Sequence, residues 1–444
     1  MNGMSGKLKI HIIGAGISGL SVAYYLNKVN KDLEITLWEK SSDPGGLAGV
    51  FRSDNFCLEK FYHHIYRRDR GIQNLVADLN VGPVVWKASN TGAYFLNKFY
   101  RLSSPIDLLQ FEPLPFIDRI RFGLMMLKAK TIRNWESLDD ISAKQFIIAQ
   151  GGETVYKVVW EPLLRGKFGA YAETVSAAWL WCKLVDRGSR NPQGMEELGY
   201  IKGGFGVIFE KIVDILTQAG HAVNFNTPVE KLEANSRGAI QYVHTPGQRN
   251  EADVVIGCTQ TPDIAKILPE QFGAYRQQLE KIKFLSVVCL ILVLEKSLAQ
   301  FYWNNIYDPE SPFIGVIEHT HWTGREDFNN KHIVYISAYV DPQDARLKMD
   351  ARQLLEHYFP YIKKMFPQFD RSILYKTFLW TAPYAQPIVE IGYRKLTPDI
   401  RSSIKNLLIC TMAQIYPHDR QVSNGVEMGE KTANQIIETM GRSA

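Results

Sequence analysis

The chain has 444 residues, of which 45% are hydrophobic and 22% charged, a composition that suits two or three packed domains and excludes general disorder. Its 51 basic and 46 acidic residues leave a net charge of +5, spread along the chain, so we expect no nucleic-acid partner. Five widely spaced cysteines without a Cys-x-x-Cys pair, and an N-terminus without a signal-peptide core, predict a cytoplasmic protein with no metal site.

The first elements of the chain predict a dinucleotide-binding unit. A strand at 8–13 leads into Gly14, Gly16 and Gly19, followed by a helical pattern and a second strand at 33–40. In such a unit the first glycine permits the tight turn, the second lets the backbone approach a pyrophosphate, and the third lets helix and strand pack closely. The alternative is a glycine turn that holds no ligand.

Glu39 ends the second strand, 20 residues after Gly19, where a carboxylate accepts hydrogen bonds from ribose hydroxyls. These residues suit NAD and FAD equally. The doublet Gly45 and Gly46 then favours a ligand that continues past its pyrophosphate into a flavin, because adjacent glycines let the chain pass against a bulky group. The alternative for the doublet is a simple turn after Pro44.

The middle of the chain predicts helices followed by a second sheet. Residues 105–185 are mostly helical in pattern, with a capping box at Ser142 and a helix stop at Gly151 and Gly152. Strand patterns return later, at 221–226, 253–258, 286–295, 332–340 and 406–410. The last helix is expected from Gly425 to about Met440. The fold class is therefore α/β, or α+β overall, with a Rossmann-type domain and an inserted domain of mixed sheet plus helices.

Residues 114–133 alternate apolar and basic side chains at helical spacing. One interpretation is a solvated helix with one buried face. The other is a basic amphipathic helix that rests on an anionic membrane surface, which would make the membrane a peripheral partner.

The chain resembles the FAD-dependent flavin amine oxidase and protoporphyrinogen-oxidase-like superfamily. The resemblance rests on the glycine turn, the acidic strand end, the Gly-Gly doublet, and the segments FYHHIY, APYAQPIV and MAQIYPHDR. It extends from Lys9 to about Thr439 and is specific mainly in the FAD-binding parts. The segment LEKFYHHIYRRD is also similar to the histidine-containing flavin segment of UDP-galactopyranose mutases.

This resemblance implies FAD as the cofactor and extends the set of residues expected to contact it. An acidic residue that binds the ribityl chain in many amine oxidases is replaced here by Met412, and Asp419 is the expected substitute. The whole expected set is Gly14, Ala15, Gly16, Ile17, Ser18, Gly19, Glu39, Lys40, Gly45, Gly46, Leu47, Tyr62, Val229, Met412, Asp419, Gly425 and Val426.

Three residues are the expected catalytic groups. His63 and His64 would pass beside the flavin ring and move a proton or hydrogen-bond its edge, unless they make only structural hydrogen bonds. Tyr416 would form part of an aromatic wall, unless it belongs to the core.

The resemblance implies an FAD-dependent oxidoreductase that transfers a hydride from a small-molecule or lipid-linked substrate to flavin N5. The alternatives are a flavin-dependent nucleotide-sugar isomerase and a non-catalytic FAD-binding protein. The expected domains are a discontinuous FAD-binding domain (1–95, 196–280 and 385–444), a mainly helical subdomain (96–195) and a substrate-domain sheet (281–384).

Overall fold

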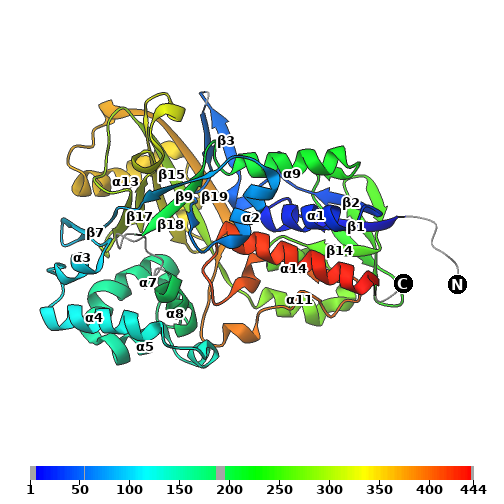
Figure 1. Cartoon of the computed structure of the whole chain (residues 1–444), viewed down its shortest axis with the longest axis horizontal. Coiled ribbons are helices and arrows are strands. Elements are labelled where there is room, and N and C mark those ends of the chain that lie inside the picture. Colours follow the sequence, from blue (N-terminus) through cyan, green and yellow to red (C-terminus); the bar gives the residue numbers. More distant parts are fainter. Residues whose placement is uncertain (1–6, 55, 187–195, 442–444) are drawn as a thin grey trace.

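The computed structural model describes residues 7–54, 56–186 and 196–441, and has three regions (Figure 1). A parallel sheet with its helices occupies the right-hand side, where both ends of the chain lie. A larger sheet lies at the upper left, and a group of helices lies below it. The predicted fold class is confirmed: helices and strands are mixed, and the first sheet is Rossmann-type.

The first sheet has five parallel strands in the order β10-β2-β1-β14-β20. They are β1 (Leu8–Ile13), β2 (Leu33–Trp38), β10 (Ala222–Asn224), β14 (Val254–Gly257) and β20 (Leu407–Ile409). The central strands are nearly continuous apolar runs because helices cover both faces of the sheet. The strands predicted at 221–226 and 253–258 belong to this parallel sheet and not to a second sheet, because β10 pairs with β2 and β14 pairs with β1.

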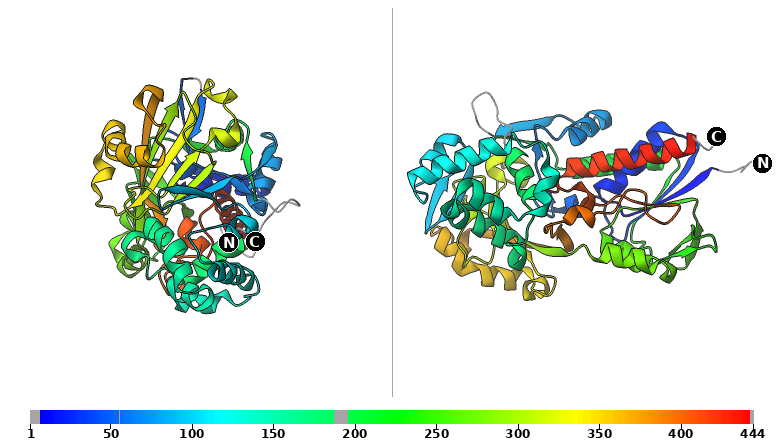
Figure 2. Two further views of the ribbon diagram at one scale, coloured as in Figure 1. Left: turned by 90° about the vertical axis from the view of Figure 1, so that its left-hand side faces the viewer. Right: turned by 90° about the horizontal axis from the view of Figure 1, so that it is seen from below.

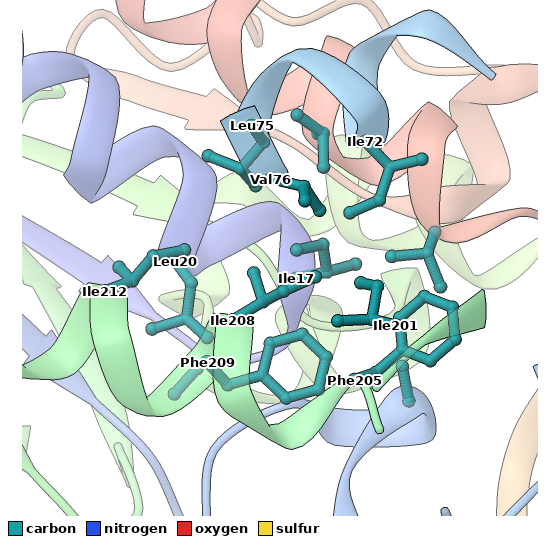
Figure 3. Packing of buried hydrophobic residues seen from close by; sticks show 14 of the residues in the cluster. Ile17, Leu20, Ile72, Leu75, Val76, Ile201, Phe205, Ile208, Phe209 and Ile212 are labelled. Carbon is teal, nitrogen blue, oxygen red and sulfur yellow. The ribbon is translucent and has the colours of Figure 1, made fainter. Parts of the chain in front are cut away.

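Helices α1 (Ile17–Val29), α2 (Arg70–Leu79) and α9 (Gly206–Gln218) share one core beside this sheet. Figure 3 shows their side chains pointing toward one another, with Leu20 of α1, Ile72 of α2 and Phe209 of α9 among them. Burial of these apolar faces stabilises the α/β layer.

The last helix, α14 (Val422–Gly441), lies alongside α1 at very short range (Figure 2). A Cβ on Gly429 would lie 2.5 Å from Ser21 Cβ and 2.9 Å from Ser18 O, so only glycine allows this approach. The predicted start of the helix at Gly425 is wrong, since the helix begins three residues earlier. The apolar face already begins at Val422, which is buried together with Val426 one turn later.

The large sheet has seven strands in the order β19-β15-β18-β17-β16-β7-β8, all antiparallel except the pair β16 and β7. They are β7 (Thr91–Phe95), β8 (Lys98–Arg101), β15 (Phe284–Leu294), β16 (Trp303–Ile306), β17 (Gly315–Glu318), β18 (His332–Val340) and β19 (Leu374–Pro387). The predicted boundary at 95/96 falls between β7 and β8, which pair with each other. The division into three domains stays a prediction.

The helical region contains α3 (Pro105–Leu109), α4 (Phe116–Ala129), α5 (Ala143–Gly151), α6 (Glu153–Val155), α7 (Glu161–Phe168) and α8 (Ala177–Asp186). The predicted capping box is confirmed: Ser142 Oγ accepts from the N–H of Gln145 and the Gln145 side chain accepts from Ser142 N–H. Gly152 ends α5 with a φ of 92°, a conformation that favours glycine.

The remaining strands and helices lie within or between these regions. They are β3 (Val50–Ser53), β4 (Phe56–Glu59), β5 (Ile65–Tyr66), β6 (Val84–Ala88), β9 (Glu197–Ile201), β11 (Lys231–Ala234), β12 (Ile240–Thr245), β13 (Gln248–Glu251), α10 (Thr261–Ile267), α11 (Gly273–Glu280), α12 (Thr320–Thr323) and α13 (Ala351–Met365). Across the described residues, no helix is long and apolar enough to cross a membrane, and no three metal-ligating side chains gather.

Replacement of Gly429 tests the contact between α1 and α14. We expect Gly429→Ala to lower the free energy of unfolding by about 1–3 kcal/mol, because the added methyl meets backbone atoms that must move. Gly123→Ala in α4 is the matched control, since a Cβ there meets no atom within 4 Å. The control should be neutral or stabilising by up to about 1 kcal/mol. Urea denaturation of both variants measures the difference, and equal effects would contradict the expectation.

Candidate functional site

The glycine turn packs tightly on one side and is open on the other. Gly14 has a φ of +105° and donates its N–H to Trp38 O at 2.8 Å. A Cβ on Gly19 would lie 2.0 Å from Gly14 O, whereas a Cβ on Gly16 would meet nothing within 4 Å. No side chain caps α1 at Gly16, which leaves the first-turn N–H groups for an anionic ligand.

Glu39 follows β2, where the sequence pattern places it, and its carboxylate is held against the turn. One oxygen accepts the N–H of Ala15 at 2.8 Å and the other accepts the N–H of Ser41 at 2.8 Å. Each carboxylate oxygen still has lone pairs for a further donor, so the two backbone bonds fix Glu39 without using up its acceptor capacity. Its expected role at a ribose stays a prediction.

The doublet Gly45 and Gly46 lies against the same turn. Gly45 N–H donates to Ala15 O at 2.8 Å, and both glycines have a positive φ. A Cβ on Gly45 would lie 2.6 Å from the ring of Phe209, and one on Gly46 would lie 3.2 Å from Gly16 Cα. In the structure the small size of the doublet therefore allows close contact with α9 and with the turn itself.

The chain returns to the turn after β20. Met412 Sδ lies 3.8 Å from Ser18 Oγ on α1, and a Cβ on Gly425 would lie 2.6 Å from Ile17. Ile17, Ser18 and Val426 are buried at this junction. The N-terminal and C-terminal segments thus converge, as expected, beside the start of α1.

Met412 also lines a small cavity between β19, α8 and the segment that precedes α14, with room for about one water molecule. The cavity is lined by Trp179, Gln386, Pro387, Val389, Tyr393, Met412, Ala413, Ile415, Tyr416, His418, Asp419 and Arg420. Met412 therefore joins the glycine-turn side of the molecule to the cavity side.

The expected flavin segment, Tyr62 to His64, is packed among aromatic rings. Tyr62 meets Trp303 edge to face with centroids 4.9 Å apart, and His64 lies 5.7 Å from the same ring. His63 Nδ1 lies 2.6 Å from Phe61 O. Burial, with a smaller contribution from the positive charge of Arg420, lowers the pKa of His63 to about 4, so this imidazole is neutral at pH 7.

Tyr416 belongs to a buried polar network on the cavity wall. Its hydroxyl lies 2.6 Å from Ser176 Oγ and donates to a carboxylate oxygen of Asp139. Burial and the bond to Asp139 raise the pKa of Tyr416 well above its usual value, so it stays protonated at neutral pH. The centroid of its ring lies 5.0 Å from that of Tyr393, and the two rings are tilted. Tyr416 thus has an aromatic neighbour, as expected for an aromatic wall, and its hydroxyl contacts also give it a structural role.

Asp419 is bound by two lysines of the helical region. Both carboxylate oxygens lie 2.9 Å from Lys167 Nζ, and Lys183 Nζ also donates to this group. Burial raises the pKa of Asp419, but the two lysine charges outweigh it and hold the pKa well below its usual value. Its expected contact with a ribityl chain stays a prediction, and the structure gives it ionic partners that the sequence did not indicate.

Arg420 was missed by the sequence analysis and lines the cavity. Its guanidinium donates to Gln386 Oε1 at 3.1 Å and to Tyr339 OH at 3.2 Å, both neutral groups. The segments APYAQPIV and MAQIYPHDR contain Gln386 and Arg420, but nothing in their spacing indicates that they meet. The positive charge of Arg420 is therefore held at the cavity by neutral acceptors.

The remaining predicted contacts lie at the edges of the site. Lys40 is largely exposed, with its Nζ 3.9 Å from Asp263. Leu47 lies half-buried in the turn that follows the doublet. Val229 packs, partly buried, against the cluster that contains Trp38. The roles of these residues at a cofactor stay predictions.

The residues present fit a flavin dinucleotide. Thr259 Oγ1, beside Gly14, and Asn424 Oδ1, in the first turn of α14, are buried and have no hydrogen-bond partner among the described residues. The open side of Gly16 suits a pyrophosphate, and the cavity beyond Met412 adjoins the segment that leads into α14. Met412 connects the turn to the cavity, since it contacts Ser18 and lines the cavity.

Comparison with known families settles the assignment. The family described as flavin containing amine oxidoreductase matches residues 17–437. The chain belongs to this family. The resemblance inferred from the sequence is confirmed, since the matched family is one of flavin-containing oxidoreductases.

Individual relatives are distant. Coproporphyrinogen III oxidase of Staphylococcus aureus is 28% identical over 179 residues, which are 38% of this chain and 38% of that protein. The match thus spans well under half of the relative. 15-cis-phytoene desaturase of Synechococcus elongatus is 22% identical and covers 97% of this chain and 96% of its own. A crystal structure of reduced UDP-galactopyranose mutase superposes with a TM-score of 0.77 at 13% identity, covering 98% and 96% of the two chains, which shows a shared fold.

Replacement of Gly16 separates cofactor binding from folding. We expect Gly16→Val to leave the unfolding free energy of the apoprotein within about 0.5 kcal/mol of the wild type, because the first added carbon meets no protein atom. FAD affinity should fall by about 10–100-fold, since the side chain enters the space for the pyrophosphate. Gly19→Ala is the matched control and should destabilise the apoprotein itself. Titration with FAD and urea denaturation measure the two quantities, and unchanged FAD affinity of Gly16→Val would contradict the placement.

Because the pKa of His63 is low in the folded state, we expect the protein to lose stability in acid. Folded His63 stays neutral to about pH 4, while the unfolded side chain takes a proton near pH 6.5. The unfolded state therefore binds more protons between these values, and His63 contributes a loss of about 3 kcal/mol to wild-type stability as the pH drops through this window. We expect His63→Asn to lose about 3 kcal/mol less than the wild type between pH 7 and pH 4. Exposed His357→Gln, the control, should follow the wild type in urea denaturation across this range.

Proposed function

We propose that the protein oxidises a small-molecule or lipid-linked substrate that binds beside Tyr416 and Arg420. Bound FAD supplies the hydride acceptor, flavin N5, and the positions of the turn, Met412 and the cavity support a ring bound at this end of the molecule. The observation that carries the proposal is the continuity from Gly16 through Met412 to the cavity wall.

The chain's own residues orient the substrate, and their protonation states set the charge of the site. His63 is neutral and Tyr416 is protonated at pH 7, so both act as hydrogen-bonding groups rather than as charged ones. Arg420 offers a positive charge whose present acceptors are neutral, and it binds a polar or anionic part of the substrate. The aromatic and apolar wall excludes water from the reacting atoms.

A reducing, cytoplasmic location is part of the proposal. It is supported by five free cysteines, of which Cys258 and Cys410 lie side by side at the ends of β14 and β20 without forming a bond.

Anaerobic mixing of the FAD-loaded protein with candidate substrates tests the reaction. We expect one class among amines, porphyrinogens, isoprenoid lipids and nucleotide sugars to bleach the flavin band at about 450 nm. Arg420→Gln should keep the band but slow bleaching by about tenfold or more, because the substrate loses a charged contact. Exposed Arg401→Gln is the control and should behave as the wild type.

Two results would contradict the oxidase proposal. Turnover of a nucleotide sugar only after prior reduction of the flavin, with no acceptor consumed, would indicate an isomerase. A flavin that no substrate class reduces, with equal spectra for wild type and Arg420→Gln, would indicate a non-catalytic FAD-binding protein.

A further inference from the structure

Exposed apolar side chains gather at one corner of the molecule, away from the proposed active site. Of the 13 large hydrophobic residues exposed in the described part of the chain, eight lie between residues 96 and 127. They are Leu96, Ile106, Leu109, Phe116, Ile117, Ile120, Leu124 and Leu127, with exposed fractions from 42% to 76%. This group, here called the α3–α4 face, lies at the end opposite the chain termini (Figure 1).

Helix α4 presents its apolar stripe to solvent. The five α4 members of the face fall within an arc of about 100° when successive residues are placed about 100° apart. The opposite side carries Met125 and Ala129, which are buried against the helical region. Helix α4 therefore has one buried face, as one interpretation of the sequence pattern holds, but Met125 and Ala129 form that face and the stripe does not. The neighbouring helices already fill the space behind Met125 and Ala129.

Basic side chains flank the stripe on both sides. By the same helical geometry, Arg119 and Lys130 project along one edge of the stripe, and Arg121 and Lys128 along the other. Asp118 is the one acidic residue in 114–133, and it is buried and paired with Arg121 at 3.2 Å. Arg119 donates to the carbonyls of Leu109 and Leu114, and Lys128 to the Gln150 side chain, so their charges have no carboxylate partner among the described residues.

We propose that the α3–α4 face docks the protein onto an anionic lipid bilayer, with α4 lying in the plane of the headgroups. An exposed apolar stripe with cationic edges matches acyl chains below and anionic headgroups at the rim. The stripe consists of large side chains that project from a convex helix surface. The net charge of residues 114–133 is strongly positive. A second copy of the same face would set like charges against each other, so self-association is the poorer match.

The docked helix shares a core with the wall of the cavity. Trp181 of α8 donates its indole N–H to Ala129 O at the end of α4, and Trp179 of the same helix lines the cavity. One cluster of buried residues includes Met125 and Ala129 of α4 together with Tyr393 and Ala413 of the cavity wall. The helical region therefore lies between the proposed lipid surface and the cavity, an arrangement suited to a substrate that arrives from the membrane.

Co-sedimentation of the full chain with vesicles tests the docking, whatever the reaction proves to be. We expect binding to phosphatidylcholine vesicles with about 30% phosphatidylglycerol, and at least about tenfold weaker binding to phosphatidylcholine alone. Raising salt from about 0.1 M to about 0.5 M should weaken binding several-fold, since the headgroup attraction is screened.

Two sets of variants locate the contact. Phe116→Ser/Leu124→Ser/Leu127→Ser should reduce vesicle binding by about tenfold or more, and Lys128→Glu/Lys130→Glu should abolish the preference for anionic vesicles. The matched control is Val29→Ser/Val85→Ser/Ile391→Ser, which removes exposed apolar side chains elsewhere and should bind as the wild type. All affected side chains are exposed, and an unchanged thermal midpoint verifies the fold of each variant.

Other results would overturn the proposal. Wild-type protein that stays in the supernatant with anionic vesicles, or a triple serine variant on α4 that binds as well as the wild type, excludes this face as a lipid contact. If light scattering shows a wild-type dimer that becomes a monomer in the α4 triple variant, with no vesicle binding by either, the face covers a second copy instead.

Discussion

The close approach of α14 to α1 is the constraint on which the site depends. At Gly425 and Gly429 a single added carbon would overlap side-chain and backbone atoms of α1, so the two helices meet where side chains are absent. This contact brings the last part of the chain beside the first. It sets Met412 next to Ser18, and so joins the glycine turn to the cavity. A residue pair more than 390 positions apart in sequence thus defines one continuous path.

Electrostatics in this path follow from burial. Burial keeps His63 neutral and Tyr416 protonated, while Asp419 stays charged because Lys167 and Lys183 surround it. The site therefore carries hydrogen-bonding groups and balanced charges, with Arg420 held by neutral acceptors. Such a site orients and polarises a substrate and leaves the electron transfer to the cofactor. This agrees with a family whose chemistry resides in the flavin.

The helical region connects two surfaces of different character. Its inner side packs through one apolar cluster onto the cavity wall, whereas its outer side exposes the stripe of α4 between basic edges. The exposed side of α4 is more apolar than the buried side, which carries Asp118 beside Met125 and Ala129, so the hydrophobic pattern of this helix alone does not tell which side faces the protein. Packing decides it, because Met125 and Ala129 fit among neighbouring helices while the larger Phe116 and Leu124 project outward.

Local patterns in the sequence determined the βαβ unit, the position of Glu39 and the capping box at Ser142, because each depends on residues within about 30 positions and on short-range geometry. The start of α14 at Val422, the ionic partners of Asp419, and the meeting of Arg420 with Gln386 and Tyr339 were decided only by tertiary structure. These features join segments from different sheets and helices, and no spacing along the chain encodes such contacts. Burial and the volume available between packed elements select them once the fold has formed.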